Sequence, residues 1–319
     1  MEVYNNSNFK HLLFRAALLD DNFAASIALR VNYSIEEGMA TAITMDPFWK
    51  LEANPQETIY GSLINEAVIK RGGIDLFLFG YAYGGKEKNV KFTDVEVNIP
   101  GKFSNSIKVF GDRHWDLGLL KYNITDPKAF DKILLSNCNS YGGFDLWDGL
   151  MVPYPFNPDG KGYAVNKDSL HGKPLPNIED PNNLINSWKD KPSPVGVCAT
   201  RWCEKRIKIG LGLNGKPENS PTKLSPILYN DAYLGMITNG LLPGDNIVIT
   251  GMNAKGKFQF KIPNMDMKLK LRFADNEYNR KFYIDQIGIE PDENRAFITY
   301  RYAFNYKFKA KEKREIFIN

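Results

Sequence analysis

The chain has 319 residues, of which 43% are hydrophobic and 13% aromatic, and its formal net charge is +4. These values suit a globular protein with a large core, and the apolar runs are too short for a membrane span of about 20 residues. Near-balanced charge over the body of the chain disfavours a nucleic-acid partner. The start, MEVYNNSNFK, does not resemble a secretory signal, and three cysteines do not suggest a disulfide framework. We therefore expect a cytoplasmic protein.

The N-terminal part carries strong strand signals. Residues 23–35 alternate apolar and polar side chains, the pattern of a strand with one buried face. Residues 74–83, IDLFLFGYAY, are apolar on both faces and predict a strand buried on both sides. Residues 57–71 are ambiguous, because their apolar residues fall at helical spacing but lie in a β context.

Residues 91–115 predict a β-hairpin that ends in an unusual motif. Apolar and polar side chains alternate before and after a Pro-Gly pair, which marks the reversal of the chain. The motif Gly-Asp-Arg-His-Trp follows the return strand. We expect Asp112 to accept backbone N–H bonds in this turn. We expect Arg113 to stack on Trp115 or to pair with an acid such as Asp94.

The middle of the chain, from about 136 to 205, is rich in Gly, Pro, Asn and Trp and shows little periodicity. Long ordered segments of this kind are usually binding or lid elements. Only residues 180–190 look helical, with Asp180 as the N-cap. Four aromatic residues on these loops are candidate anchors for a protein partner, with core packing as the competing interpretation. They are Trp147, Tyr154, Phe156 and Trp188.

The C-terminal third reads as an antiparallel meander. Five strand-like segments are separated by turn-length pieces, at 246–253, 256–263, 268–275, 281–289 and 296–309. The last places aromatic residues on one face, and Thr299 and Arg301 on the other, which predicts a sheet with one wet face. The lysines near the C-terminus fit a solvated strand end.

The predicted fold is mainly β, a β-rich α+β protein with antiparallel sheets in a sandwich-like arrangement and few short helices. We expect one compact domain over 1–319. Its expected sub-parts are an N-terminal β part (1–135), irregular binding loops (136–205) and a C-terminal meander (206–319).

The sequence offers no recognisable catalytic constellation. It contains no G-x-S-x-G, no phosphate-binding loop and no H-E-x-x-H, and its three histidines are far apart. The C-x4-C spacing of Cys198 and Cys203 is not that of a zinc knuckle. A glycosidase-type pair would be sought among Asp145, Asp148 and Glu179. We therefore expect neither an enzyme nor a metal or cofactor, with a carbohydrate-active or glycan-binding β-sandwich as the alternative.

Several motifs occur in a fixed order along the chain, and Gly111-Asp112-Arg113-x-Trp115 is the strongest of them. This order resembles a bacterial family long labelled as a domain of unknown function, whose members are encoded beside type VI secretion effectors with PAAR-like spike-tip domains. The chain departs from the family pattern where residues 71–74 replace a Lys-Pro and where Tyr300 replaces a Trp. The matching positions are Asp75, Gly80, Asp94, Gly111, Asp112, Arg113, Trp115, Gly142, Gly143, Asn157, Gly160, Gly162, Pro176, Glu179, Trp202 and Arg301.

The resemblance implies a cytoplasmic adaptor or chaperone that binds a PAAR-like effector and helps to load it onto the VgrG spike. Under this interpretation the motif residues are structural. The binding surfaces come mainly from residues 141–190, through aromatic anchors or strand addition. Neither nucleic acid nor membrane is an expected partner. A permanent structural component of a contractile injection machine is a third hypothesis.

Overall fold

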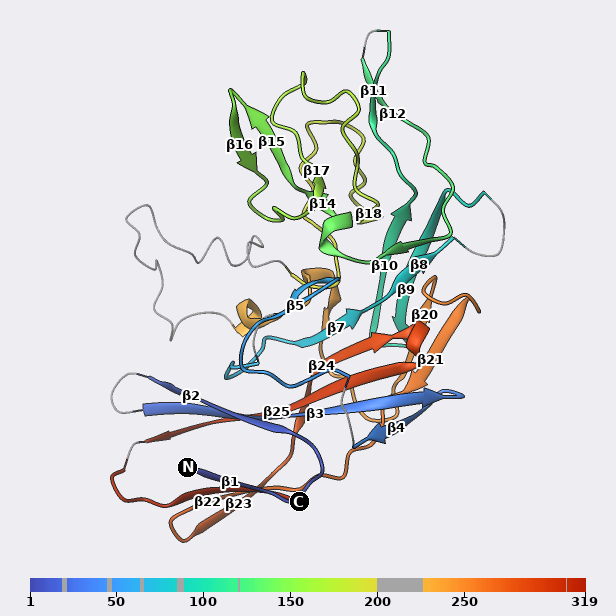
Figure 1. The fold of residues 1–319 in the computed structure, drawn as a ribbon. Coiled ribbons are helices and arrows are strands. Elements are labelled where there is room, and N and C mark those ends of the chain that lie inside the picture. The colour runs from blue at the N-terminus through green and yellow to red at the C-terminus, as the bar shows by residue number, and fades with distance from the viewer. Residues whose placement is uncertain are drawn as a thin grey trace.

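The computed structural model describes residues 1–18, 22–44, 48–63, 66–84, 89–119, 121–199, 226–307 and 309–319. Strands dominate these residues, and their helices are 3₁₀ turns of three or four residues. The predicted mainly-β class is therefore confirmed. None of the helices in these ranges has the length and hydropathy needed to cross a bilayer. Figure 1 shows the larger sheets below and an irregular lobe above them.

A seven-stranded sheet forms the centre of the molecule, in the order β19-β7-β24-β25-β3-β2 with β4 also beside β3. Only the β7–β24 pair is parallel. The long pair of β3 and β25 joins the two ends of the chain and confirms the strands expected at 23–35 and 296–309. The strands are β2 (His11–Ala17), β3 (Asn22–Glu36), β4 (Met39–Ile43), β7 (Ile74–Leu78), β19 (Ile237–Thr238), β24 (Tyr283–Glu290) and β25 (Arg295–Lys307).

A five-stranded sheet contains the predicted hairpin, which is confirmed. Its order is β18-β10-β9-β20-β21, and β9 pairs with β10 from Ile99↔Phe103 to Phe92↔Phe110. The alternating apolar residues of β9 point into the core, whereas their polar neighbours are exposed or half-buried, as the period of two requires. The strands are β9 (Phe92–Ile99), β10 (Phe103–Phe110), β18 (Ile178–Glu179), β20 (Asn246–Thr250) and β21 (Lys257–Lys261).

A four-stranded sheet brings the two chain ends together, in the order β1-β26-β22-β23. The N-terminal β1 pairs in parallel with the C-terminal β26, and Figure 1 shows both termini at the base of the molecule. Residues 314 and 315 are buried there, so the basic C-terminus is not wholly a solvated end. The strands are β1 (Glu2–Asn5), β22 (Leu269–Phe273), β23 (Asn276–Arg280) and β26 (Arg314–Ile318).

The C-terminal third is not a single meander, because its strands enter all three sheets. Residues 246–261 form the β20–β21 hairpin of the five-stranded sheet. β22 and β23 belong to the four-stranded sheet, and β24 and β25 to the central one. The alternation of side chains predicted each strand but did not specify its partners.

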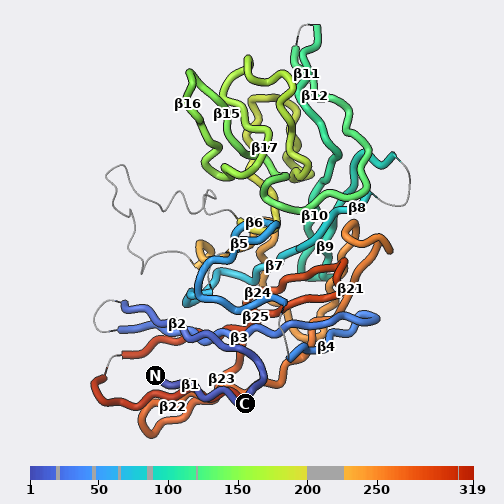
Figure 2. The backbone as a smooth tube through the Cα atoms, viewed as in Figure 1, coloured from blue at the N-terminus to red at the C-terminus, as the bar shows by residue number. Residues whose placement is uncertain are grey.

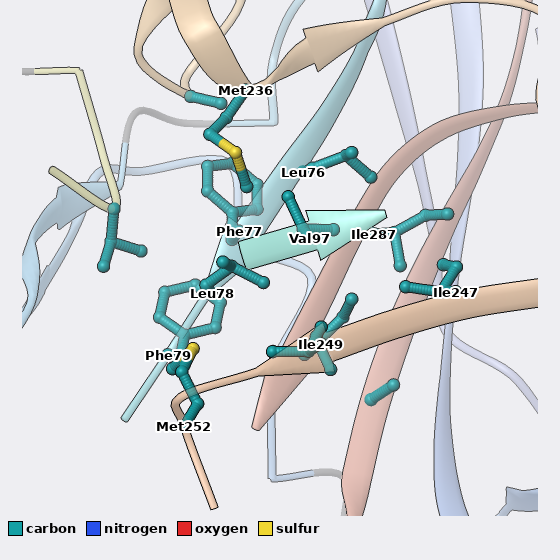
Figure 3. Packing of buried hydrophobic residues seen from close by; sticks show 14 of the residues in the cluster. Leu76, Phe77, Leu78, Phe79, Val97, Met236, Ile247, Ile249, Met252 and Ile287 are labelled. Carbon is teal, nitrogen blue, oxygen red and sulfur yellow. The ribbon is translucent and has the colours of Figure 1, made fainter. Parts of the chain in front are cut away.

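The main core lies between the central sheet and the five-stranded sheet. Figure 3 shows Leu76 and Leu78 of β7 together with Val97, Ile247 and Ile249 of the facing sheet. The four-stranded sheet covers another part of the central sheet through a cluster that includes residues 27 and 29 of β3. The predicted sandwich-like packing is thus built from three sheets. Figure 2 shows the path of the backbone through them.

The second face of the central sheet is also buried, so the expectation of a wet face on residues 296–309 is wrong there. Thr299 and Arg301 are 0% and 4% exposed. Backbone carbonyls of residues 66 and 68 accept hydrogen bonds from Arg301, which places this part of the chain over the sheet. Residues 57–71 form no helix in their described part, but two short strands, β5 (Gln56–Thr58) and β6 (Gly61–Leu63), and irregular chain.

The strand expected at 74–83 is broken at Gly80. The residues beyond it form β8 (Tyr81–Tyr83), which pairs with β13 (Lys132–Leu134) in a separate ribbon. Residues 74–79 are buried on both faces, as expected.

The lobe of residues 113–199 contains short strands and turns. The helix expected at 180–190 is absent: Asp180 Oδ1 instead accepts from the Asn182 backbone N–H in a turn, at 2.9 Å. The backbone N–H of Ile185 donates to the Glu179 side chain, where a helix would need a backbone carbonyl. The strands are β11 (Trp115–Leu117), β12 (Tyr122–Ile124), β14 (Tyr141–Gly142), β15 (Phe144–Trp147), β16 (Leu150–Pro153) and β17 (Lys161–Gly162).

Candidate functional site

Two of the predicted motif residues, Asp75 and Arg301, lie in a buried group of charges on the second face of the central sheet. This group, the charge cluster, joins strands β3, β7, β24 and β25 to the segments around residues 66–71 and 231. It contains three arginines and four carboxylates, each less than one tenth exposed. They are Arg30, Glu66, Arg71, Asp75, Asp231, Asp285 and Arg301.

Glu66 contacts all three arginines of the cluster. Its Oε1 lies 2.5 Å from Arg30 Nη2, and its Oε2 lies 2.8 Å from Arg301 Nη2 and 3.2 Å from Arg71 Nη1. Burial alone would raise its pKa, but the charges of Arg71, Arg30 and Arg301 outweigh burial and lower the pKa to about 2. Glu66 is therefore ionised, and it fastens residues 66–71 to the sheet.

Asp75 joins the cluster to residues 230–232. Its Oδ1 accepts from Asn230 Nδ2 at 2.8 Å and from the Ala232 N–H at 3.1 Å, and its Oδ2 accepts from the Asp231 N–H at 2.9 Å. Arg71 Nε lies 3.2 Å from the same Oδ2. Every oxygen of this fully buried carboxylate thus faces donors, as burial of a charge requires.

The Gly-Asp-Arg-x-Trp motif forms a second buried ion pair. Arg113 Nη2 binds Glu179 Oε1, and its guanidinium lies over the ring of Phe110, 3.7 Å from the centroid. The expectation that Arg113 pairs with an acid is therefore confirmed, but the acid is Glu179 and not Asp94, which pairs with a lysine. The expected stacking on Trp115 is wrong, since Trp115 packs into the lobe core. The Asp94 pair is on the surface and joins it to Lys108 Nζ at 3.0 Å.

The expected partners of Asp112 are also different in the structure. Its Oδ1 accepts from the side-chain amide of Asn177 at 3.2 Å, where a backbone N–H was expected. At the neighbouring Gly111, an added Cβ would lie 1.8 Å from the Lys128 carbonyl oxygen, so the two chain segments touch there. The motif thus makes close structural contacts at the base of the lobe.

A group of motif residues holds the lobe together around Asn157. Asn157 Nδ2 donates to the Asn137 carbonyl at 2.8 Å and to the Tyr141 carbonyl at 3.1 Å, and the backbone carbonyl of Asn157 accepts from the Gly143 N–H at 2.8 Å. At Gly142, whose φ is +154°, an added Cβ would lie 2.0 Å from the Asn157 oxygen. This group, the Asn157 knot, contains Gly142, Gly143, Asn157, Gly160, Gly162 and Pro176.

Three of the four aromatic candidates pack in or against the hydrophobic cluster of the lobe. Tyr154 is buried, with its ring centroid 4.9 Å from that of Tyr141 and 5.3 Å from that of Phe156, and its hydroxyl donates to a backbone carbonyl. Phe156 and Trp188 are half-buried against the same cluster. Only Trp147 is more than half exposed.

Trp147 lies on an exposed apolar β-hairpin formed by β15 and β16. Figure 1 shows this hairpin on the upper lobe, away from the three large sheets. Leu146 pairs with Met151 and Trp147 with Leu150 across the two strands. Five large side chains of the hairpin are each more than half exposed. They are Phe144, Leu146, Trp147, Leu150 and Met151, here called the apolar hairpin.

The side chain of Asp145 attaches the apolar hairpin to the rest of the lobe. Asp145, between two exposed residues, points inward and is buried. Its carboxylate accepts from Ser169 Oγ at 2.6 Å and the Val165 N–H at 2.8 Å, and Lys173 Nζ lies 2.6 Å away. Burial raises its pKa, but the bonds from Lys173, Ser169 and Val165 together lower it.

Two of the three carboxylates considered for a glycosidase-type pair have structural partners. Asp145 is bound to Lys173, and Glu179 to Arg113. Asp148, with a φ of +50°, occupies the turn of the apolar hairpin. A glycosidase acid needs a raised pKa, and the pKa of Asp145 is lowered.

Sequence reasoning missed both the apolar hairpin and most of the charge cluster. Asp148-Gly149 between apolar residues is the usual signal of a two-residue hairpin turn, and both residues have positive φ. Arg30 and Arg301 each lie between two large apolar residues of a strand, and an arginine that is buried there needs a carboxylate partner. That signal predicts a buried ion pair but not which acids supply it. Trp202 lies outside the described residues.

A family model described as "Uncharacterized protein conserved in bacteria (DUF2169)" matches residues 24–301. The match runs from β3 to β25 and includes both the charge cluster and the lobe. Since it spans most of the sequence, the chain belongs to this family. Neither a curated protein nor a solved structure matched the chain.

Proposed function

We propose that this DUF2169 protein is a cytoplasmic type VI secretion adaptor or chaperone, which binds a PAAR-like effector and assists its loading onto the VgrG spike. The proposal starts from the motif order, which resembles such adaptors. The observation that carries it in the structure is the apolar hairpin, whose five large exposed side chains lie on one supersecondary element. Apolar side chains gathered on a protein surface are typical of binding sites for other proteins.

The base of the hairpin favours binding without a large loss of conformational freedom. The ion pair and hydrogen bonds of Asp145, together with the Asn157 knot, hold the strands in place before any partner arrives. A preorganised surface loses less entropy on association than a flexible loop does. Trp147, the exposed aromatic residue at the tip, has the character of an interface anchor.

The hairpin also offers strand edges to a partner. Within the part of the chain that the structure describes, β15 and β16 pair only with each other. Strand addition to such an edge is a common way of binding an extended peptide. An unpaired strand of an effector would thereby be protected from aggregation until the spike offers a better partner. Under this proposal the protein has no catalytic turnover, and release depends on competition between partners.

The test is a binding measurement between the full chain and a PAAR-like effector. We expect a stoichiometric complex, recovered with the tagged protein from its native cytoplasm. In biolayer interferometry, Trp147→Ala should weaken binding by about 1–3 kcal/mol, and Leu146→Ser should act in the same direction. Met39→Ser is the matched control, because Met39 is an exposed apolar residue at the start of the distant strand β4.

The possible outcomes test the role of the apolar hairpin separately from the adaptor function. A complex whose affinity is the same for wild type, Trp147→Ala and Leu146→Ser would contradict the role of the hairpin but leave the adaptor function standing. The absence of any complex with the PAAR-like effector, or lasting incorporation of the protein into purified sheath–spike particles, would contradict the adaptor function itself.

A further inference from the structure

Two hollows lie side by side at one end of the central sheet and share Tyr283 and Ile284 of β24. The smaller has a volume of about 460 Å³ and reaches from these residues to the chain just before β7. The larger, of about 760 Å³, extends over the start of β22 and the end of β23. The two hollows, which share only these two lining residues, are together called the basic groove.

At the groove, within the ranges that the structure describes, the first residues of β24 have a neighbouring strand on one side only. β24 pairs with β7 only from Gln286 onward, whereas Tyr283 and Ile284 pair with β25 alone. Gly73, just before β7, is packed so tightly on β19 that an added Cβ would lie 2.7 Å from Ile237. Residues 69–73 line the same hollow as Tyr283 but form no strand pair with it. Among the described residues, no strand covers this edge of β24, so it is open to strand addition.

The rim of the groove is positively charged. Four exposed basic residues line it: Lys70, Lys268, Arg280 and Lys281. In the described parts of the chain, none of the four forms an ion pair with a carboxylate. Asp266 is exposed on the same rim, whereas Asp285 is buried and bound to two arginines of the charge cluster. The rim therefore attracts acidic side chains.

The floor of the groove is apolar. Leu241 and Leu269 are buried there, and Met265 and Phe282 are half-buried. The ring of Tyr283 is 67% exposed and stands where the two hollows meet. In an extended peptide, successive side chains point to opposite sides. Every second side chain can then enter a hollow, while the others face the basic rim.

We propose that the basic groove binds an extended acidic segment of a partner protein, in which acidic and apolar residues alternate, by strand addition to β24. The chain's own residues 200–225 fit the charge poorly, since they carry six Lys or Arg against two Asp or Glu. The groove and the apolar hairpin are built from different elements. The inference therefore does not depend on the proposed adaptor function.

The test uses a fluorescein-labelled synthetic peptide in which glutamate alternates with valine, and measures its fluorescence anisotropy with the full chain. We expect saturable binding that weakens as NaCl is raised, because salt screens exposed charges. The double variant Arg280→Glu/Lys281→Glu should weaken binding about tenfold or more, since attraction becomes repulsion at two positions. Tyr283→Ala should also weaken it through loss of the ring between the hollows.

Two matched controls separate the groove from general attraction. Lys255→Glu/Lys257→Glu makes the same charge change at exposed positions of the β20–β21 hairpin, and should leave binding unchanged. A second peptide keeps the same side chains but has every backbone amide N-methylated, which removes the N–H donors from both of its edges and prevents strand pairing. This peptide should not bind.

Three results would overturn the inference. The first is the absence of saturable binding of the Glu–Val peptide to the wild type at low salt. The second is equal weakening by the two double variants, which would mean general electrostatic attraction. The third is equal binding of the N-methylated peptide, because strand addition needs free backbone N–H groups.

Discussion

At the scale of single residues, the charge cluster is where we expect a single substitution to reduce the stability of the fold most. Each of its three arginines contacts at least one buried carboxylate, and Arg71 contacts four. Removing one member of such a group leaves opposite charges buried without compensation. These side chains join β3, β24 and β25 to residues 66–75 and 231, so the loss of one contact disturbs several elements.

Glu66→Gln tests this dependence on a single charge. The amide keeps the shape of the side chain but leaves Arg30, Arg71 and Arg301 with less negative charge around them. We expect a loss of about 3–5 kcal/mol in the free energy of unfolding, measured by urea denaturation. Glu277→Gln is the control, because Glu277 is exposed and its pair with Lys270 is screened by water. Equal stability of wild type and Glu66→Gln would contradict the prediction.

Wild type and Glu66→Gln also test how the free energy of unfolding depends on pH. The pKa of Glu66 is lowered from its ordinary value of 4.5 to about 2 in the folded protein. Its contribution is therefore fully present above pH 4.5 and is lost as the pH falls toward 2. The stability difference between wild type and Glu66→Gln should shrink over this range in urea titrations. A difference that widens on acidification would show that Glu66 is not held ionised.

At the scale of elements, the lobe depends on close backbone contacts because it has little regular structure. Its parallel pair β14–β17 has only two residues in each strand. The Asn157 knot supplies the remaining order through side-chain hydrogen bonds to backbone carbonyls. The apolar hairpin starts immediately after this knot, at Phe144. The position of the apolar hairpin therefore depends on the glycine contacts beneath it.

Gly142→Ala tests the link between the knot and the hairpin. A methyl group at this position would meet the Asn157 carbonyl, so we expect a loss of about 3 kcal/mol or more and faster proteolysis within residues 136–199. In Gly149→Ala, at the hairpin turn, the methyl group has no heavy atom within 4 Å and only the positive φ is unfavourable. This control should lose about 1 kcal/mol. Equal sensitivity of the two variants would contradict the role of the knot.

At the scale of the whole molecule, the two ends of the chain are built into the same sheets. β3 and β25 pair over thirteen positions, and β1 and β26 pair in parallel. β26 lies between β1 and β22, and its Ile316 and Ile318 pack against residues of β3 in the core. The last residues thus belong to the core, although the charge pattern of the C-terminus alone suggested a solvated end.

Ile316→Ala tests this closure of the molecule. The side chain is fully buried, so its truncation should cost about 2–5 kcal/mol in urea denaturation. Ile59→Ala is the matched control, since Ile59 is 64% exposed and the same truncation there should change stability by about 0.5 kcal/mol at most. A C-terminal strand that is only loosely attached would make the two variants equally stable.

The strands of this protein could be predicted where one local pattern was enough. In β9, β10 and β25 the alternation of side chains gave the strand and its bounds to within a few residues. The four aromatic candidates show the limit of such patterns. All lie in the lobe, but only the three-dimensional packing separates Trp147 on the surface from Tyr154 in the core. Aromatic residues on a polar loop have the same sequence signal in both places.

The sequence by itself therefore determined the β class, the main hairpin and the irregular middle, because these follow from the period of side chains along a few neighbouring residues. Only the tertiary structure decided which strands are neighbours and which charges are buried. Arg30 meets Glu66 and Arg301 meets Asp285 because the chain folds residues 66–71 over a sheet built from both of its ends. Pairing of this kind depends on contacts between distant residues, which no local pattern records.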